Sequence, residues 1–206
     1  MKLTERADEA LNELMEGNRR FREGSPKAYR YSPSDLLHIS RNQTPLAGII
    51  ACADSRVSPE LVFDQPLGSI FASRVPGNVA SDSAKWMLDL AVNEFRVPLV
   101  MVMGHTGCLA VGQLLDGDKG GAGGLHRFSV LSAVYRAKTK AHDPGEFYLK
   151  AVEENVQQTV EHLARDSYSL RASLIDGTTS IVGSVYHMET GEVKILESTL
   201  EMYGRC

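Results

Sequence analysis

Cysteine and aromatic residues are scarce in this chain, and long apolar runs are missing. Its 206 residues include three cysteines and one tryptophan, and aromatic residues make up 7% of the chain. So few cysteines, in an odd number, exclude a disulfide-rich scaffold. The main apolar runs, 46–53 and 98–103, have the length of strands and are too short to cross a membrane. We therefore expect a globular protein without a membrane partner.

Clusters of basic residues are also missing. Charged residues make up 23% of the chain, the formal net charge is −4, and no stripe of Lys and Arg stands out. We therefore expect no nucleic-acid partner. Residues 1–24 are charged throughout and lack the apolar segment of a secretory signal peptide, which predicts a cytoplasmic protein. The apolar content of 43% is sufficient for a buried core.

Short apolar runs alternate with amphipathic segments along the chain. The predicted strands are apolar and bounded by turn residues: 46–51, 70–72, 98–103, 180–187 and 192–197. Between these strands the sequence predicts helices at 58–63, 81–95, 107–115, 128–140 and 144–165. In the helix 81–95, Trp86 is expected to face the core. This order predicts an α/β fold: a mainly parallel sheet flanked by helices, with an antiparallel hairpin at its C-terminal edge.

The chain shows no internal repeat and no linker, so we predict one domain, 1–206. Within it, an N-terminal helical arm, 1–42, precedes an α/β core, 43–206. The glycine-rich stretch 117–124 is predicted as a loop. It is not typical of a phosphate-binding P-loop, because it lacks the Gly-Lys-Ser/Thr ending and follows a helix.

Three residues with metal-binding side chains follow two of the predicted strands. Cys52 follows the strand 46–51, and His105 and Cys108 follow the strand 98–103. Ligand sites in open α/β sheets lie outside the carboxyl ends of strands, so we expect these side chains to converge. Zinc prefers thiolate and imidazole ligands, and three protein ligands instead of four leave a position for water, whose pKa zinc lowers to about 7. The sequence predicts a catalytic zinc site.

Asp54 and Arg56 come two and four residues after Cys52. We expect Asp54 to accept a hydrogen bond at the zinc site, and Arg56 to bind Asp54 and keep it ionised. Taken alone, a cysteine is more often a core residue, and an Asp–Arg pair is more often a surface ion pair of little energetic value. Their joint occurrence at two strand ends favours the metal site.

These residues form two motifs that resemble those of the β-class carbonic anhydrases. The similarity continues through 68–78 to 181–186 and covers most of the chain. The motifs are Cys52-Ala-Asp54-Ser55-Arg56 and His105-Thr-Gly-Cys108. The resemblance implies a zinc ion held by Cys52, His105 and Cys108, an Asp54–Arg56 catalytic pair, and reversible hydration of carbon dioxide to bicarbonate and a proton.

The resemblance also implies roles for residues outside these motifs. Gln43 matches a position that donates a hydrogen bond to substrate, and Phe71 matches a position that lines an apolar carbon dioxide pocket. The implied assembly is a homodimer or homotetramer, with active sites at the interface between subunits. One subgroup of the family closes its zinc site with the aspartate and has a tryptophan where this chain has Ile49, so we expect an open site.

Two alternatives stay open. Leu109 and Leu90 depart from the family pattern, and they leave room for hydrolysis of carbonyl sulfide or carbon disulfide at the same zinc ion. The other alternative is a non-catalytic zinc protein, in which Asp54 completes the coordination of the metal. The pairing of Asp54 with Arg56 argues against this second alternative.

Overall fold

A computed structural model describes residues 3–115, 117, 124–141 and 143–202 of the chain. Most of the predicted loop 117–124 lies outside these residues. The elements, of which η1 is a 3-10 helix, follow in this order: α1 (Glu5–Arg22), α2 (Pro33–Ile39), β1 (Ala47–Ala51), α3 (Pro59–Val62), β2 (Ile70–Arg74), η1 (Pro76–Asn78), α4 (Asp82–Asn93), β3 (Leu99–His105), α5 (Leu109–Leu115), α6 (Gly124–Lys140), α7 (Pro144–Asp166), α8 (Tyr168–Ile175), β4 (Ser180–His187), β5 (Glu192–Ile195) and α9 (Glu197–Met202).

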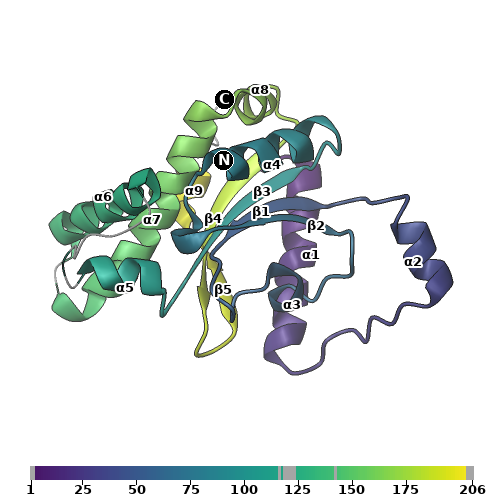
Figure 1. Ribbon diagram of the computed structural model, residues 1–206, viewed down its shortest axis with the longest axis horizontal. Coiled ribbons are helices and arrows are strands. Elements are labelled where there is room, and N and C mark those ends of the chain that lie inside the picture. The colour runs from purple at the N-terminus through teal and green to yellow at the C-terminus, as the bar shows by residue number, and fades with distance from the viewer. Residues whose placement is uncertain (1–2, 116, 118–123, 142, 203–206) are drawn as a thin grey trace.

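The strands form one sheet in the order β2-β1-β3-β4-β5 (Figure 1). The first four strands of this order pair in parallel, and β5 pairs antiparallel with β4. Every residue of β1 and β3 is buried, as expected for parallel strands that are covered on both faces. The predicted α/β fold with a mainly parallel sheet and a C-terminal antiparallel pair is confirmed.

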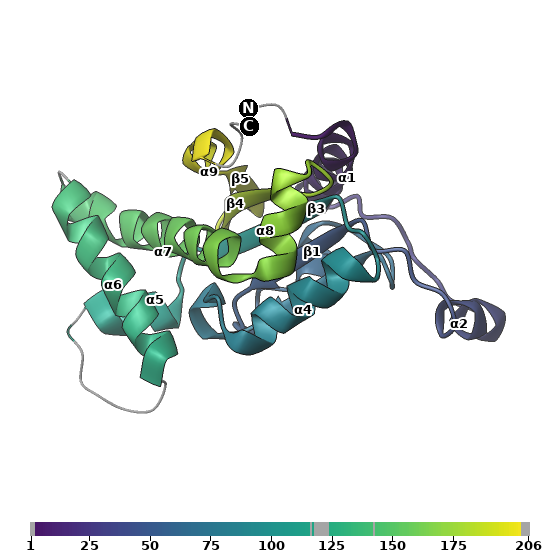
Figure 2. The ribbon, with the colours of Figure 1, turned by 90° about the horizontal axis from the view of Figure 1, so that it is seen from above.

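Helices cover both faces of the sheet (Figures 1 and 2). On one face, Val102 of β3 belongs to a core cluster with Leu88 of α4 and Val156 of α7. On the other face, Met101 belongs to a cluster with Leu14 of α1. The helix α2 stands apart from this body, and none of its residues is buried (Figure 2). The division at residue 42 stays a prediction.

The expectation that Trp86 faces the core is wrong, because its side chain is 68% exposed. The helix α4 instead buries small and aliphatic residues, among them Ala84, Leu88 and Ala91. An ideal Cβ on Gly48 of β1 would lie 3.2 Å from Leu88 and 3.5 Å from Ala91, so this face lies close against the sheet. Trp86 lies about 200° around the helix from Ala84 and therefore points to solvent.

Two short helices, α8 and α9, were not predicted from the sequence. The predicted strand 192–197 ends earlier, and α9 begins at Glu197. The Thr199 hydroxyl accepts a hydrogen bond from the Gly183 N–H of β4 at 2.9 Å, so a contact with the sheet holds this helix in place. Within the described ranges, no helix combines the length and the apolar character needed to span a membrane.

The close approach of α7 to β3 gives a first prediction. An ideal Cβ on Gly104 would lie 2.6 Å from Val156 Cγ2 and 3.2 Å from Val152 Cγ1. We expect Gly104→Ala to lower the free energy of unfolding by about 1–3 kcal/mol, because the packed core must shift to admit the methyl group. Urea unfolding followed by circular dichroism measures this change.

Gly112 of α5 is the matched control for this substitution. The nearest atom to an ideal Cβ on Gly112 is Tyr148 Cε2, at 3.9 Å. Gly112→Ala is expected to leave stability unchanged or to raise it by up to about 1 kcal/mol, since alanine favours the helix. A Gly104→Ala variant as stable as Gly112→Ala would contradict the close packing.

Candidate metal centre

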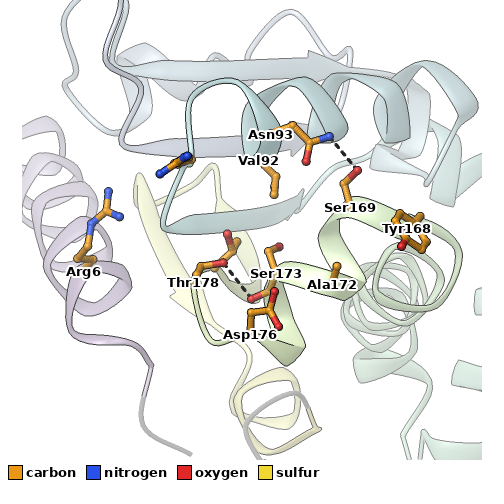
Figure 3. A pocket seen from close by; sticks show the side chains of 11 residues that line it. Arg6, Val92, Asn93, Tyr168, Ser169, Ala172, Ser173, Asp176 and Thr178 are labelled. Atoms are coloured by element: carbon orange, nitrogen blue, oxygen red, sulfur yellow. Dashed lines mark hydrogen bonds between the residues drawn. The ribbon is translucent and has the colours of Figure 1, made fainter.

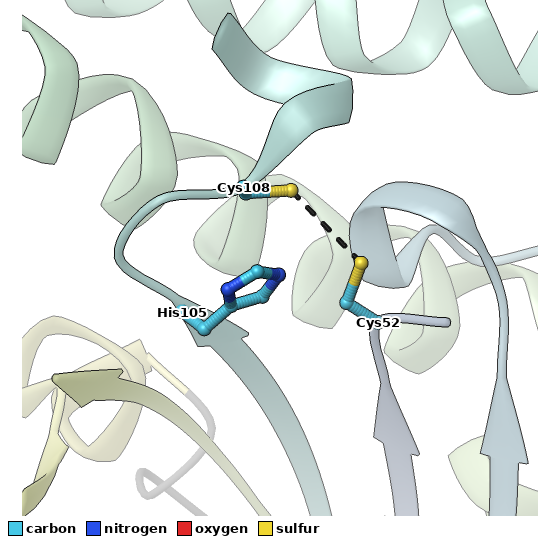
Figure 4. A group of neighbouring side chains, drawn as sticks. All are labelled: Cys52, His105 and Cys108. Carbon is cyan, nitrogen blue, oxygen red and sulfur yellow. Dashed lines mark hydrogen bonds between the residues drawn. The ribbon is translucent and has the colours of Figure 1, made fainter. Parts of the chain in front are cut away.

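Cys52, His105 and Cys108 meet at the carboxyl edge of the sheet (Figure 4). Cys52 directly follows β1, His105 is the last residue of β3, and Cys108 directly precedes α5. Ala51 of β1 lies opposite Met103 of β3 in a parallel pair, so both strands end at the same edge. The two sulfurs and a histidine nitrogen all lie within 4.8 Å of one another, and all three residues are buried.

The donor atoms fit a metal ion. The sulfurs are 4.0 Å apart, close to the separation of about 3.8 Å in a tetrahedral zinc site with Zn–S bonds of about 2.3 Å. His105 Nδ1 lies 2.8 Å from the Thr106 carbonyl oxygen, so Nδ1–H donates and Nε2 keeps its lone pair. Nε2 is buried without a hydrogen-bond partner among the described residues. A buried unpaired acceptor is unfavourable, and a metal ion would pair it.

The number of ligands also matters for the chemistry. The group contains three residues, and no other His, Cys, Asp or Glu in the described part of the chain belongs to it. Structural zinc sites use four protein ligands, whereas catalytic sites use three and keep one position open. The group therefore has the composition of a catalytic metal site.

The two thiols hold their protons unequally. The hydrogen bond with Cys108 lowers the pKa of Cys52 below its ordinary value, against the opposing effect of burial. The backbone N–H groups of Asp54 and Gly77 lower this pKa further. The same hydrogen bond, together with burial and the charge on Cys52, raises the pKa of Cys108. The pair therefore releases one proton readily and keeps the other until a cation compensates the second charge.

Asp54 is held beside the cluster by Arg56. The backbone N–H and Nε of Arg56 donate to Oδ1 at 3.0 and 2.9 Å, and Nη2 donates to Oδ2 at 2.7 Å. These hydrogen bonds hold the pKa of Asp54 well below its ordinary value, so the carboxylate stays ionised. Nη2 also donates to the Gly107 carbonyl at 3.2 Å, and this contact joins the pair to the loop between His105 and Cys108.

Two residues that the sequence interpretation did not assign hold the ligand loops. Arg74, at the end of β2, donates to the carbonyls of Cys52 and Asp54 at 3.2 and 2.5 Å. Tyr148 of α7 donates its hydroxyl to the Cys108 carbonyl at 3.2 Å, and burial raises the pKa of this hydroxyl to about 12. Arg74 lies in the stretch 68–78, whose similarity to the family could have pointed to it. Tyr148 is 40 residues from Cys108, and no sequence motif pointed to it.

Gln43 and Phe71 lie away from the cluster in this chain. Gln43 precedes β1 whereas Cys52 follows it, and five strand residues span about 17 Å. Phe71 lies opposite Gly48, near the amino end of β1, and its ring packs against Phe95 with centroids 5.3 Å apart. Gln43 and Phe95 line the same pocket. The fold thus gathers these residues at the amino edge of the sheet, not beside the metal ligands.

Another pocket, of ≈410 Å³, lies between α4 and α8, with Arg6 of α1 at its side (Figure 3). Asn93 donates to the Ser169 hydroxyl at 2.9 Å, and Thr178 donates to the Ser173 carbonyl at 3.3 Å, so two hydrogen bonds border this pocket. The described residues that line it include no cysteine or histidine. This pocket is therefore separate from the metal-binding group.

The fold and the site define an α/β protein with a Cys–His–Cys group that can bind a metal ion. A family model described as "Carbonic anhydrase" matches residues 47–193. Carbonic anhydrase 2 of Mycobacterium tuberculosis is 33% identical over 185 residues, which cover 88% of this chain and 89% of that protein. The carbonic anhydrase of Mycolicibacterium smegmatis is 31% identical over 191 residues, which cover 90% of this chain and 91% of that protein.

Solved structures agree with the sequence comparisons. The β-carbonic anhydrase of Coccomyxa, solved in complex with acetazolamide, has a TM-score of 0.65 and 28% sequence identity. The match covers 90% of this chain and 86% of that one. The chain belongs to the β-class carbonic anhydrase family.

The convergence of three buried ligands predicts the metal content. We expect one zinc ion per chain after dialysis, measured by plasma mass spectrometry. Cys52→Ser and His105→Ala are each expected to lose the metal, because the remaining ligands are too few to retain it. Cys206→Ser, which changes the third cysteine, is the control and should keep it. Retention of one zinc ion by both ligand variants would contradict the assignment.

Proposed function

We propose that this protein binds zinc through Cys52, His105 and Cys108 and catalyses the reversible hydration of carbon dioxide to bicarbonate and a proton. The observation that carries the proposal is the convergence of three buried ligand atoms at the carboxyl edge of the sheet in a member of this family. Zinc bound there would supply a Lewis acid that brings the pKa of water to about 7.

Asp54 and Arg56 are the proposed catalytic pair. The Asp54 carboxylate is ionised, and lone pairs that Arg56 does not use can accept a hydrogen bond from a water beside the cluster. That hydrogen bond orients the water toward carbon dioxide. Arg56 opposes rotation of Asp54 toward the metal, which keeps a coordination position open. The replacement of a bulky tryptophan by Ile49 supports the same open arrangement.

Gln43 and Phe71 are proposed to serve the active site of a second copy of the chain. Within one chain they lie near each other at the amino edge of the sheet, whereas the ligands lie at the carboxyl edge. An interface between copies in a homodimer or homotetramer can join the two edges. Phe71 would then present apolar surface to carbon dioxide, and Gln43 would donate a hydrogen bond to an oxygen of substrate or product.

The alternatives gain little support. Leu109 is 71% exposed at the start of α5, and Leu90 is partly buried on α4, so neither argues for a sulfur-containing substrate. The bonds from Arg56 to Asp54 argue against a closed, non-catalytic site. Comparing the rate of carbon dioxide hydration with the rate of sulfide release from carbonyl sulfide distinguishes the two reactions.

The catalytic pair gives a prediction for carbon dioxide hydration. Asp54→Asn is expected to retain zinc and to lower kcat/KM by at least about 100-fold, because the amide cannot provide the same acceptor and charge. Stopped-flow assays at pH 7 and pH 8.5, with metal analysis of the same samples, measure the effect. Asp82→Asn is the control, since Asp82 is exposed on α4 and pairs with Lys85 at 2.8 Å. A fully active Asp54→Asn enzyme would disprove the proposed role.

Mixing of subunits tests the role of Gln43 across the interface. Homo-oligomers of Gln43→Ala and of Asp54→Asn are each expected to have low activity. A hybrid dimer combines Asp54 of one subunit with Gln43 of the other at one of its two sites, so the purified hybrid should have about half of wild-type activity. Co-expression with two affinity tags supplies the hybrid. Activity no higher than that of the separate variants would argue against sharing of the site.

A further inference from the structure

Cys52 is held by the turn that follows β2. The Val75 N–H donates to the Ala51 carbonyl at 3.0 Å, and the Val75 carbonyl accepts from the Ala53 N–H at 3.2 Å. The residues before and after Cys52, Ala51 and Ala53, are therefore both hydrogen-bonded to Val75. The turn continues directly into η1, which contains Gly77. The placement of this turn therefore decides how the first ligand is held.

A hydrogen bond from Asn155 of α7 holds this turn in place. The Asn155 Nδ2 donates to the Gly77 carbonyl at 2.7 Å, and both residues are buried. Gly77 has a left-handed backbone with φ of 69°, and an ideal Cβ there would lie 2.9 Å from Val130 Cγ2. Without Asn155, the Gly77 carbonyl would be unpaired in the interior, which is unfavourable enough to make the turn move.

Tyr148 holds the second cysteine from the same helix, two turns before Asn155. The Cys108 carbonyl accepts a hydrogen bond from the Tyr148 hydroxyl at 3.2 Å and another from the Gly112 N–H at 2.9 Å. Cys108 is thus joined to α5 through Gly112 and to α7 through Tyr148. A single helix therefore contacts the Cys108 loop directly and the Cys52 loop through the turn after β2.

The helix α7 is itself well anchored, as a positioning element must be. Val152 and Val156 pack against Gly104, the residue before His105. Glu154 has a side chain that is 1% exposed, and it forms ion pairs at 3.2 and 2.8 Å with two cations of α6. Movement of α7 is restricted on the side of the sheet and on the side of α6.

We infer that α7 positions both cysteine ligands, Asn155 through Gly77 and Tyr148 through the Cys108 carbonyl, and that these two residues set the metal affinity of the site. They are positioning residues, since Tyr148 acts through the Cys108 carbonyl and Asn155 through the turn that is hydrogen-bonded to both neighbours of Cys52. The inference rests on the proposed metal site. Outer groups that orient metal ligands typically change affinity by about 10- to 100-fold when they are removed.

The experiment measures zinc affinity by competition with a chelator. Asn155→Ala and Tyr148→Phe are each expected to weaken zinc binding by about 10- to 100-fold. Thr159→Val is the matched control: Thr159 is buried one turn after Asn155 on α7, and its hydroxyl has no partner among the described residues. This variant should keep wild-type affinity. Cobalt substitution adds a spectrum, in which the thiolate-to-cobalt band should change only in the first two variants.

Each outcome decides the inference. Wild-type zinc affinity with a wild-type cobalt spectrum in either variant would overturn the role of that residue, even if the variant melts at a lower temperature. An equal loss of affinity in Thr159→Val would show a general effect of helix stability and would also overturn it. If Asn155→Ala does not fold, the zinc affinity of Tyr148→Phe decides the inference. This variant removes only the hydroxyl and keeps the packing of the aromatic ring. Failure of the proposed metal site looks different, since the wild-type protein would then bind neither metal at one ion per chain.

Discussion

The parallel pairing of β1 with β3 is the constraint on which the site depends. These parallel strands run in the same direction and in register, so Ala51, the last residue of β1, lies opposite Met103, two residues before the end of β3. The chain leaves β1 through Cys52, while β3 continues to His105, so a thiol and an imidazole come together without a long loop. Close packing fixes this register, because Leu88 and Ala91 of α4 lie against Gly48, where a larger residue of β1 would not fit.

Charge compensation is the second requirement at this edge. Buried thiolates are unfavourable unless a cation neutralises them, and the buried imidazole nitrogen without a hydrogen-bond partner among the described residues favours the same cation. Asp54 adds a further negative charge beside them, and Arg56 balances it through hydrogen bonds to both carboxylate oxygens. The arrangement keeps a carboxylate ionised near the cluster without making it a ligand.

The molecule also has two functional edges instead of one. The metal-binding residues lie at the carboxyl edge of the sheet, while Gln43 and Phe71 lie at the amino edge. Phe95 packs against Phe71 and lines a pocket with Gln43. A separation set by the length of β1 cannot be closed by side-chain motion, because the strand is rigid and buried. Assembly of several copies offers a physical way to bring such edges together.

The sequence by itself determined the strands, the α/β class and the chemistry of the cluster. Those features are local: apolar runs bury themselves, and Cys52, Asp54 and His105 directly follow or end such runs. Only the tertiary structure decided that Trp86 faces solvent, that Tyr148 bonds to the Cys108 carbonyl and that Asn155 bonds to Gly77 in the turn beside Cys52. These outcomes depend on how close a helix lies to a sheet and on hydrogen bonds between segments far apart in the chain, which residue spacing does not encode.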